Sequence, residues 1–143
     1  MENTDKAPWH LWVVGGISLL WNLGGVASYM ATKTGYLEAM GMTGEQIEYF
    51  TSFPAWAVAF WALGVWGCAL GSLLLLLRKK FAVIAYGVSL IGLLGTTYYE
   101  RAVAIIPESM QTHGQILFAV AIWTITIALF FYARRLSAAG VLR

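Results

Sequence analysis

Residues 56–98 read WAVAFWALGVWGCALGSLLLLL-RKK-FAVIAYGVSLIGLLGTTY, which is two apolar runs separated by three basic residues. Neither run contains Asp, Glu, Lys or Arg. A helix rises 1.5 Å per residue, so about 20 apolar residues cross the ~30 Å hydrocarbon core of a bilayer. A three-residue connection can join only antiparallel neighbours. The stretch therefore predicts a transmembrane helical hairpin.

Two further runs without charge occupy residues 11–30 and 116–132. With spans at 56–77 and 81–98, the chain is expected to be all-α, a four-helix transmembrane bundle with up-down-up-down connections. Residues 1–143 would form a single integral membrane domain. The first run is longer than the apolar core of a signal peptide, which favours a retained helix over a cleaved leader.

Residues 31–53 and 99–113 are expected to be loops on one side of the membrane. Thr43-Gly44-Glu45-Gln46 has the spacing of a capping box and predicts a short helix within the first loop. Pro107-Glu108 is a suitable start for the fourth helix, because proline is favoured in a first helical turn.

The charges outside the spans are unequally divided between the two sides. Seven of the nine basic residues fall on the side of the termini: Lys6, Arg78, Lys79, Lys80, Arg134, Arg135 and Arg143. Five of the seven acids fall on the other: Glu38, Glu45, Glu48, Glu100 and Glu108. Because short cytoplasmic loops carry the excess of Lys and Arg, both termini are predicted to be cytoplasmic.

Small and polar residues recur at helical spacing on two of the spans. Such residues let helix backbones approach closely in lipid, where hydrophobicity does not drive helix association. The expected helix-packing residues are Gly64, Gly67, Cys68, Gly71 and Ser72 on the second span and Ser89, Gly92 and Thr96 on the third.

A polar stripe on the first span consists of Ser18, Asn22 and Tyr29. Asn22 has the strongest hydrogen-bonding side chain near mid-membrane, and an amide there needs partners. Two interpretations are open. The stripe either contacts a solute or makes hydrogen bonds to another helix, and the second is the more common use of such a residue.

Several functional classes lack support in the sequence. No nucleophile–base pair or metal motif is present, so the chain is not expected to be an enzyme or to hold a cofactor or metal. The single Cys68 excludes paired-thiol chemistry, and no basic tail indicates a nucleic-acid partner. The acidic side is either a cation vestibule or simply what remains when basic residues are kept on the opposite side.

Several motifs resemble a family of short bacterial inner-membrane proteins with four helices. The resemblance covers nearly the whole chain and rests on Pro8-Trp9-His10-Leu11-Trp12, Leu20-Trp21-Asn22, Phe53-Pro54-Ala55-Trp56, Leu77-Arg78, Tyr132-Ala133-Arg134-Arg135 and Gly140-Val141-Leu142-Arg143. It implies the bacterial inner membrane as the location. That family is uncharacterised, its occasional label "sugar transporter" is unsupported, and no site residues carry over.

Two functions are compatible with these features. The first is a facilitator for a neutral small solute such as a sugar, acting as a homo-oligomer because four helices rarely enclose a pathway alone. Neutral solutes need no charge inside the spans. The second is an accessory or stabilising subunit of a larger membrane complex, for which apolar spans and modest loops suffice.

Overall fold

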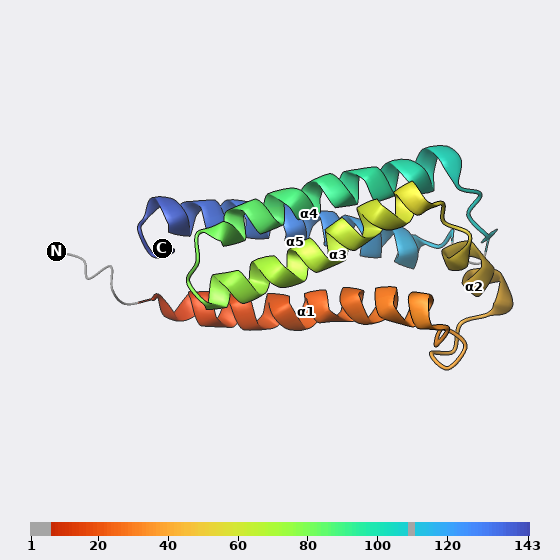
Figure 1. The fold of residues 1–143 in the computed structure, drawn as a ribbon, viewed down its shortest axis with the longest axis horizontal. Coiled ribbons are helices and arrows are strands. Elements are labelled where there is room, and N and C mark those ends of the chain that lie inside the picture. Colours follow the sequence, from red (N-terminus) through yellow and green to blue (C-terminus); the bar gives the residue numbers. More distant parts are fainter. Residues whose placement is uncertain (1–6, 109–110) are drawn as a thin grey trace.

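The computed structural model describes residues 7–108 and 111–143, and it is all-α there, as predicted. The elements in chain order are α1 (Trp9–Thr34), α2 (Gly44–Thr51), α3 (Ala55–Leu76), α4 (Phe81–Tyr98), the π-helical turn η1 (Tyr99–Val103) and α5 (His113–Ala138). In Figure 1 the four long helices run antiparallel to their neighbours in sequence. The start of α1, the α3–α4 turn and the end of α5 share one end, called here the basic end, while α2 lies at the other, the acidic end.

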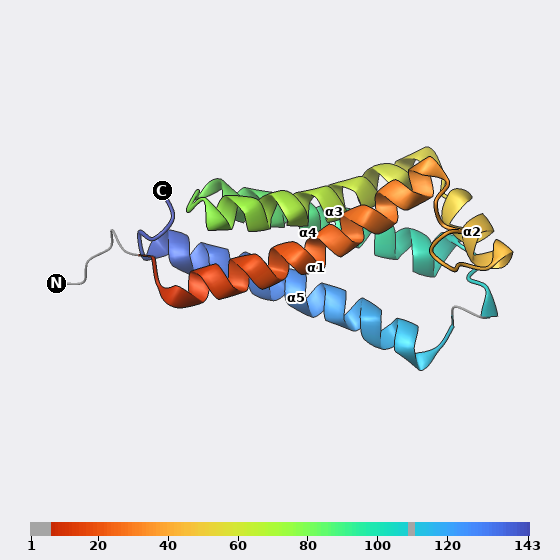
Figure 2. The same cartoon turned by 90° about the horizontal axis from the view of Figure 1, so that it is seen from below.

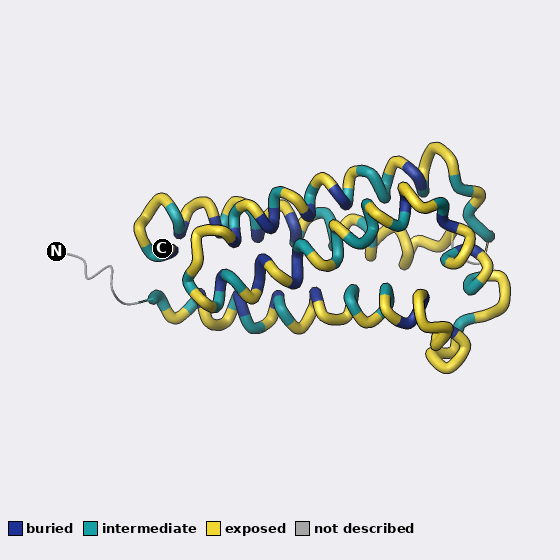
Figure 3. Tube along the Cα trace, viewed as in Figure 1, coloured by how far each residue is buried: buried dark blue, intermediate teal, exposed yellow. Residues whose placement is uncertain are grey.

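The four long helices are each long and apolar enough to cross a membrane. Many residues of these helices are exposed, shown in yellow along the tube in Figure 3, and many of the exposed residues are large and apolar. Leu20 is 73 % exposed, Leu94 63 % and Leu117 68 %. Apolar surface of this extent is far beyond what a monomer keeps in water, and lipid contact accounts for it. By length and composition, the four helices are candidate spans of a multi-pass membrane protein.

The first and last long helices extend beyond the apolar runs that predict them. The first helix reaches Thr34, four residues past the run 11–30, and ends where Gly35 adopts φ 81°. This left-handed conformation is one that glycine takes without steric cost. The last helix likewise continues through Arg134 and Arg135 to Ala138. Hydropathy marks the part of a helix that lipid surrounds, while the helix ends depend on capping.

The short helix α2 begins with the predicted capping box, which is confirmed. The Gln46 backbone N–H donates to Thr43 Oγ1 at 3.3 Å, and the Thr43 N–H donates to Gln46 Oε1 at 3.1 Å. Behind it, Tyr49, Phe53 and Tyr99 are buried together, and the Phe53 and Tyr99 ring centroids lie 4.6 Å apart. This aromatic cluster fixes α2 across the acidic ends of α3 and α4.

The segment 99–113, expected to be a loop, is helical over its first five residues. Tyr99–Val103 continues α4 as a π-helical turn, in which the Ala104 N–H donates to the Tyr99 carbonyl at 2.8 Å. Burial of Tyr99 against Phe53 holds this turn in place. Sequence hydropathy does not report such a contact, because it is made with a residue far away in the chain.

The fourth long helix starts later than the Pro107-Glu108 pair, which corrects that expectation. The first helical residue is His113, and the Thr112 hydroxyl accepts from the Gln115 N–H at 3.2 Å. A threonine side chain can satisfy an N–H of the first turn, which proline cannot do. The side-chain cap therefore decides the start.

Figure 2 shows α5 close to the other helices at the basic end and diverging from them toward the acidic end. Two side-chain contacts still reach its outer half. The ring centroids of Trp21 and Phe118 are 5.7 Å apart, and the Trp123 indole N–H donates to Thr97 Oγ1 at 3.1 Å. The tightest helix pair is α3 with α4, and α1 packs on α3.

Candidate functional site

A buried polar network lies inside the bundle, in the half nearer the basic end, and Ser72 is at its centre. The Ser72 hydroxyl is fully buried and has three partners from two other helices. Asn22 Nδ2 donates to it at 2.9 Å, Ser18 Oγ lies 2.9 Å away and the Tyr86 hydroxyl 2.8 Å away. A serine hydroxyl offers one donor and two acceptor positions. Three partners therefore use all of its hydrogen-bonding capacity.

Asn22 spans the interface between α1 and α3 with a second bond. Its Nδ2 also donates to the Cys68 carbonyl oxygen at 3.2 Å, and the residue is only 7 % exposed. Both donors of the amide are thus taken by α3. The structure uses Asn22 for an interhelical bond, the second of the two interpretations, while a solute contact for the same residue is untested.

Cys68 connects the network to the remaining helix. Its Sγ lies 3.7 Å from Thr126 Oγ1 on α5, and both residues are buried. Thr126 Oγ1 also bonds the Ile122 carbonyl at 2.7 Å, within its own helix. All four long helices therefore contribute to one connected set of polar groups. Among the described residues, no fully enclosed side-chain nitrogen or oxygen lacks a hydrogen-bond partner.

The glycines of α3 lie directly against α4. A Cβ on Gly67 would stand 3.1 Å from the Ala85 carbonyl oxygen, and one on Gly71 would stand 2.8 Å from the Tyr86 ring. Gly64 is less tight, because its nearest neighbour would be 3.6 Å away. Its carbonyl accepts from Ser89 Oγ at 2.6 Å. These residues lie where the sequence pattern expects helix packing.

On the α4 side, Gly92 lies directly against the backbone of α3. A Cβ there would stand 2.5 Å from the Phe60 carbonyl oxygen and would overlap the Gly64 backbone nitrogen. Thr96, on the same expected stripe, is half-buried and bonds the Gly92 carbonyl of its own helix at 2.8 Å. The Thr96 hydroxyl thus makes a hydrogen bond within α4 and not across the interface with α3.

Tyr29 is separate from the rest of its stripe. Its half-buried ring packs edge-on against Trp61, with the centroids 5.1 Å apart and the planes at 81°. Ser18 and Asn22 join the polar network, so the structure divides the three-residue stripe between two environments.

Tyr86 is the network member that the sequence pattern does not single out. It is fully buried, and its hydroxyl bonds Ser72. A tyrosine in the middle of a span needs a partner for its hydroxyl. Tyr86 also lies beside Ala85 and three residues before Ser89. The need for a hydroxyl partner and this position are the signals by which Tyr86 could have been found from the sequence.

The acidic end does not gather its carboxylates. Within residues 7–108 and 111–143, no three His, Cys, Asp or Glu side chains form a set that could hold a metal ion. Burial raises the pKa of Tyr49 above its ordinary value, and the negative charge of Glu100 adds to the effect. Tyr49 therefore stays neutral and acts as a packing residue of the aromatic cluster.

The bundle thus combines four candidate membrane spans with a polar network whose members bond one another. No family model matches the chain, and neither a curated protein nor a solved structure is found to be similar to it.

Proposed function

We propose that this protein is a non-catalytic accessory subunit that stabilises a larger membrane complex. One observation carries the proposal: the buried polar side chains of the network bond one another across three helices of this chain. Ser72 has no remaining hydrogen-bonding capacity, and both donors of Asn22 are engaged. A fully satisfied polar network makes a bundle rigid and specific in its packing. This property suits a structural subunit.

The proposal includes the location. The protein resides in a bacterial inner membrane with its basic end in the cytoplasm and both termini there. The resemblance to short bacterial inner-membrane proteins and the excess of Lys and Arg at this end support that placement.

The second candidate is a facilitator for a neutral solute, acting as a homo-oligomer. Its support is that Ser18, Ser72 and Tyr86 bring three hydroxyls together beside the Asn22 amide. This is the chemistry that would receive a sugar hydroxyl. A solute would first have to displace the bonds of the network, each worth roughly 0.6–2 kcal/mol between helices in lipid. The subunit function needs no such step.

Amine-reactive crosslinking in native membranes separates the two candidates. Lys33 lies near the acidic end, and Lys79 and Lys80 at the basic end, so a partner at either surface can be captured. Lys33→Arg and the pair Lys79→Arg and Lys80→Arg keep the charge and remove the reactive amine. The subunit function predicts a stoichiometric heterologous partner whose crosslink is weakened in one of these variants, with Lys6 as the remaining lysine on the side of the termini.

Two outcomes would refute the subunit function. One is crosslinking only between copies of this chain. The other is a flux of sugars or polyols in liposomes that exceeds empty liposomes and is lost in Asn22→Leu while the variant remains folded. The second outcome would establish the facilitator instead.

A further inference from the structure

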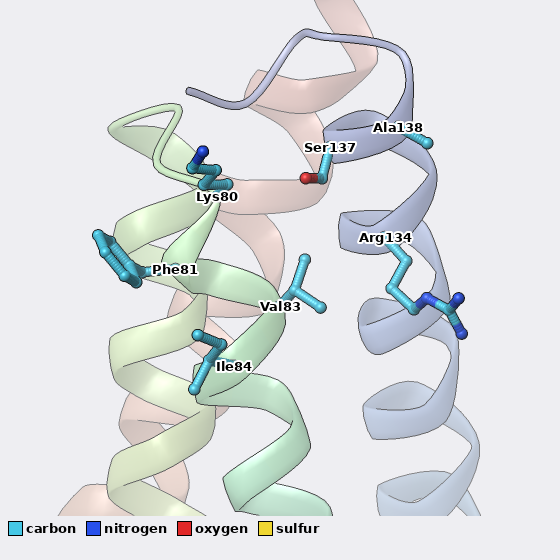
Figure 4. Close-up of a pocket in the computed structure, with 7 residues that line it drawn as sticks. All are labelled: Lys80, Phe81, Val83, Ile84, Arg134, Ser137 and Ala138. Carbon is cyan, nitrogen blue, oxygen red and sulfur yellow. The ribbon is translucent and has the colours of Figure 1, made fainter.

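A surface groove lies between the start of α4 and the end of α5, at the basic end of the bundle. Its volume is about 420 Å³. Figure 4 shows the two helices facing each other, with Val83 and Ser137 pointing toward the space between them. The residues used below are Lys80, Phe81, Val83, Ile84, Arg134 and Ser137.

The rim of this groove is positively charged. Lys80 and Arg134 are both exposed and lie on opposite sides of it. The acidic side chains of the described residues lie at the other end of the bundle, on the segments 35–54 and 100–108. No described Asp or Glu side chain therefore lies beside the two cations, while the carbonyl oxygen of the last residue, Arg143, accepts from the Lys80 backbone N–H at 3.2 Å. An anion is the complementary ligand for the two exposed side chains.

The lower part of the groove is apolar and faces the lipid. Phe81 is 60 % exposed and Ile84 61 % exposed, and Val83 lies between the two helices. One turn deeper, α4 carries Gly87, where an added Cβ would stand 3.5 Å from the Phe130 ring of α5. A ligand that fits this surface has an anionic head and an apolar tail.

The depth of the groove points to the same kind of ligand. Lys80 immediately precedes the span Phe81–Val103, and Arg134 lies in the last turn and a half of the span His113–Ala138. These positions lie at the level of the lipid headgroups. Basic pockets between transmembrane helices at this level bind anionic lipid headgroups.

We propose that this groove binds one anionic phospholipid. Its phosphate accepts hydrogen bonds from the Lys80 ammonium, the Arg134 guanidinium and the Ser137 hydroxyl, and an acyl chain lies along Ile84. In the structure, the Arg134 guanidinium carbon is 5.9 Å from the Phe130 ring centroid. The Arg134 side chain points away from the space between the helices in Figure 4. Because the side chain is exposed, binding of the phosphate would proceed with rotation about its own torsions.

The test measures lipid retention by the full chain with native mass spectrometry. The protein is released from nanodiscs that contain equal amounts of phosphatidylglycerol and phosphatidylcholine. The wild type is expected to retain one phosphatidylglycerol in preference to phosphatidylcholine. Replacing both cations, in Lys80→Gln with Arg134→Gln, should lower that preference about tenfold or more, since each cation near the surface contributes a severalfold attraction.

The matched control is Lys79→Gln with Arg135→Gln. It removes the same charge at the same end from two exposed residues that do not line the groove. The control should keep the preference within about threefold, and Ser137→Ala should lower it by a smaller factor than the double variant. An equal loss in both double variants would overturn the proposal, because the attraction would then be spread over the whole basic end. An unchanged preference in the groove variant would also overturn it.

Glycerol 3-phosphate distinguishes a lipid from a free phosphate. It carries the phosphate without acyl chains and should not displace phosphatidylglycerol at millimolar concentration. Displacement by glycerol 3-phosphate would mean that a soluble phosphate compound is the ligand, contrary to the proposal. Far-UV circular dichroism of every variant verifies that the helices remain folded.

Discussion

At the scale of single residues, Ser72 connects the most elements. Its one hydroxyl contacts side chains of α1 and α4, and the neighbouring Cys68 carries the connection to α5. Removing this oxygen leaves Asn22, Ser18 and Tyr86 each without one partner in a buried place. In lipid such groups cannot form replacement hydrogen bonds with water. Loss of the Ser72 hydroxyl should therefore weaken the association of the helices.

The coupling between Asn22 and Ser72 can be measured with a double-mutant cycle. We expect Asn22→Ala and Ser72→Ala each to lower the free energy of unfolding in detergent by about 1–2 kcal/mol. The two losses should be less than additive by about 0.6–1.7 kcal/mol, because the same bond is removed by either change. Ser28→Ala, which alters a serine of α1 outside the network, is the control. Strict additivity would show that the two side chains are not bonded.

At the scale of elements, α3 and α4 form the central pair of the bundle. Glycines on both helices bring the backbones together, and Ser89 donates across the interface to the Gly64 carbonyl at 2.6 Å. Close backbone approach gives van der Waals contact, which is a main attraction between helices in lipid. Positions on this interface differ sharply in how much space they leave.

That difference predicts unequal losses of stability for two alanine substitutions on the same interface. Gly92→Ala would place a methyl group 2.5 Å from the Phe60 carbonyl oxygen, and we expect it to cost about 1–3 kcal/mol of unfolding free energy. Gly64→Ala meets its nearest atom at 3.6 Å and should cost less than about 1 kcal/mol. At Gly24 an added Cβ would have no atom within 4 Å, so Gly24→Ala should not lower the free energy of unfolding. Thermal unfolding in detergent gives the order, and equal losses at Gly64 and Gly92 would contradict the packing.

The outer half of α5 is expected to be the least protected part of the long helices. Residues 113–120 are exposed except for Ala119, whereas Thr126, Leu129 and Ala133 of the same helix are buried. Segments with few buried contacts open locally at low free energy. Hydrogen–deuterium exchange in detergent should therefore be faster over 113–120 than over 126–136, which is the control within one helix. Equal protection of both halves would mean that the outer half packs more closely than it does here.

At the scale of the whole molecule, the charge is divided between two ends. Exposed Lys79, Lys80, Arg134 and Arg135 lie at the basic end. The described acidic side chains lie at the other. The antiparallel helices bring residues from distant parts of the chain to each end and so concentrate the asymmetry that orients membrane proteins.

The orientation is tested with reporters at the two ends. A reporter enzyme that is active only outside the cytoplasm should be silent when fused after Arg143. It should be active when inserted at Gly41, which is exposed in the loop between α1 and α2. Activity in the first fusion and silence in the second would reverse the orientation and with it the proposed cytoplasmic placement of the lipid groove.

The amino-acid sequence by itself determined the four helices, the hairpin at residues 78–80 and the capping box at Thr43. These features depend on local causes: uninterrupted apolar runs, a turn too short for other connections and a side chain that reaches its own backbone. The glycine positions of the α3–α4 interface also followed from spacing, because small residues every fourth position share one helix face.

The tertiary structure alone decided which polar groups meet. Ser72 could have faced either neighbouring helix or lipid, and its bonds to Asn22 and Tyr86 depend on how far each helix is rotated about its axis. Tyr29 lies about two turns beyond Asn22 on the same face of α1, so it meets a different part of α3, at Trp61. Helical periodicity places residues on a face of one helix, but the partner of that face is set by packing among all four helices. For this reason the elements could be predicted from the sequence, whereas the network and the lipid groove could not.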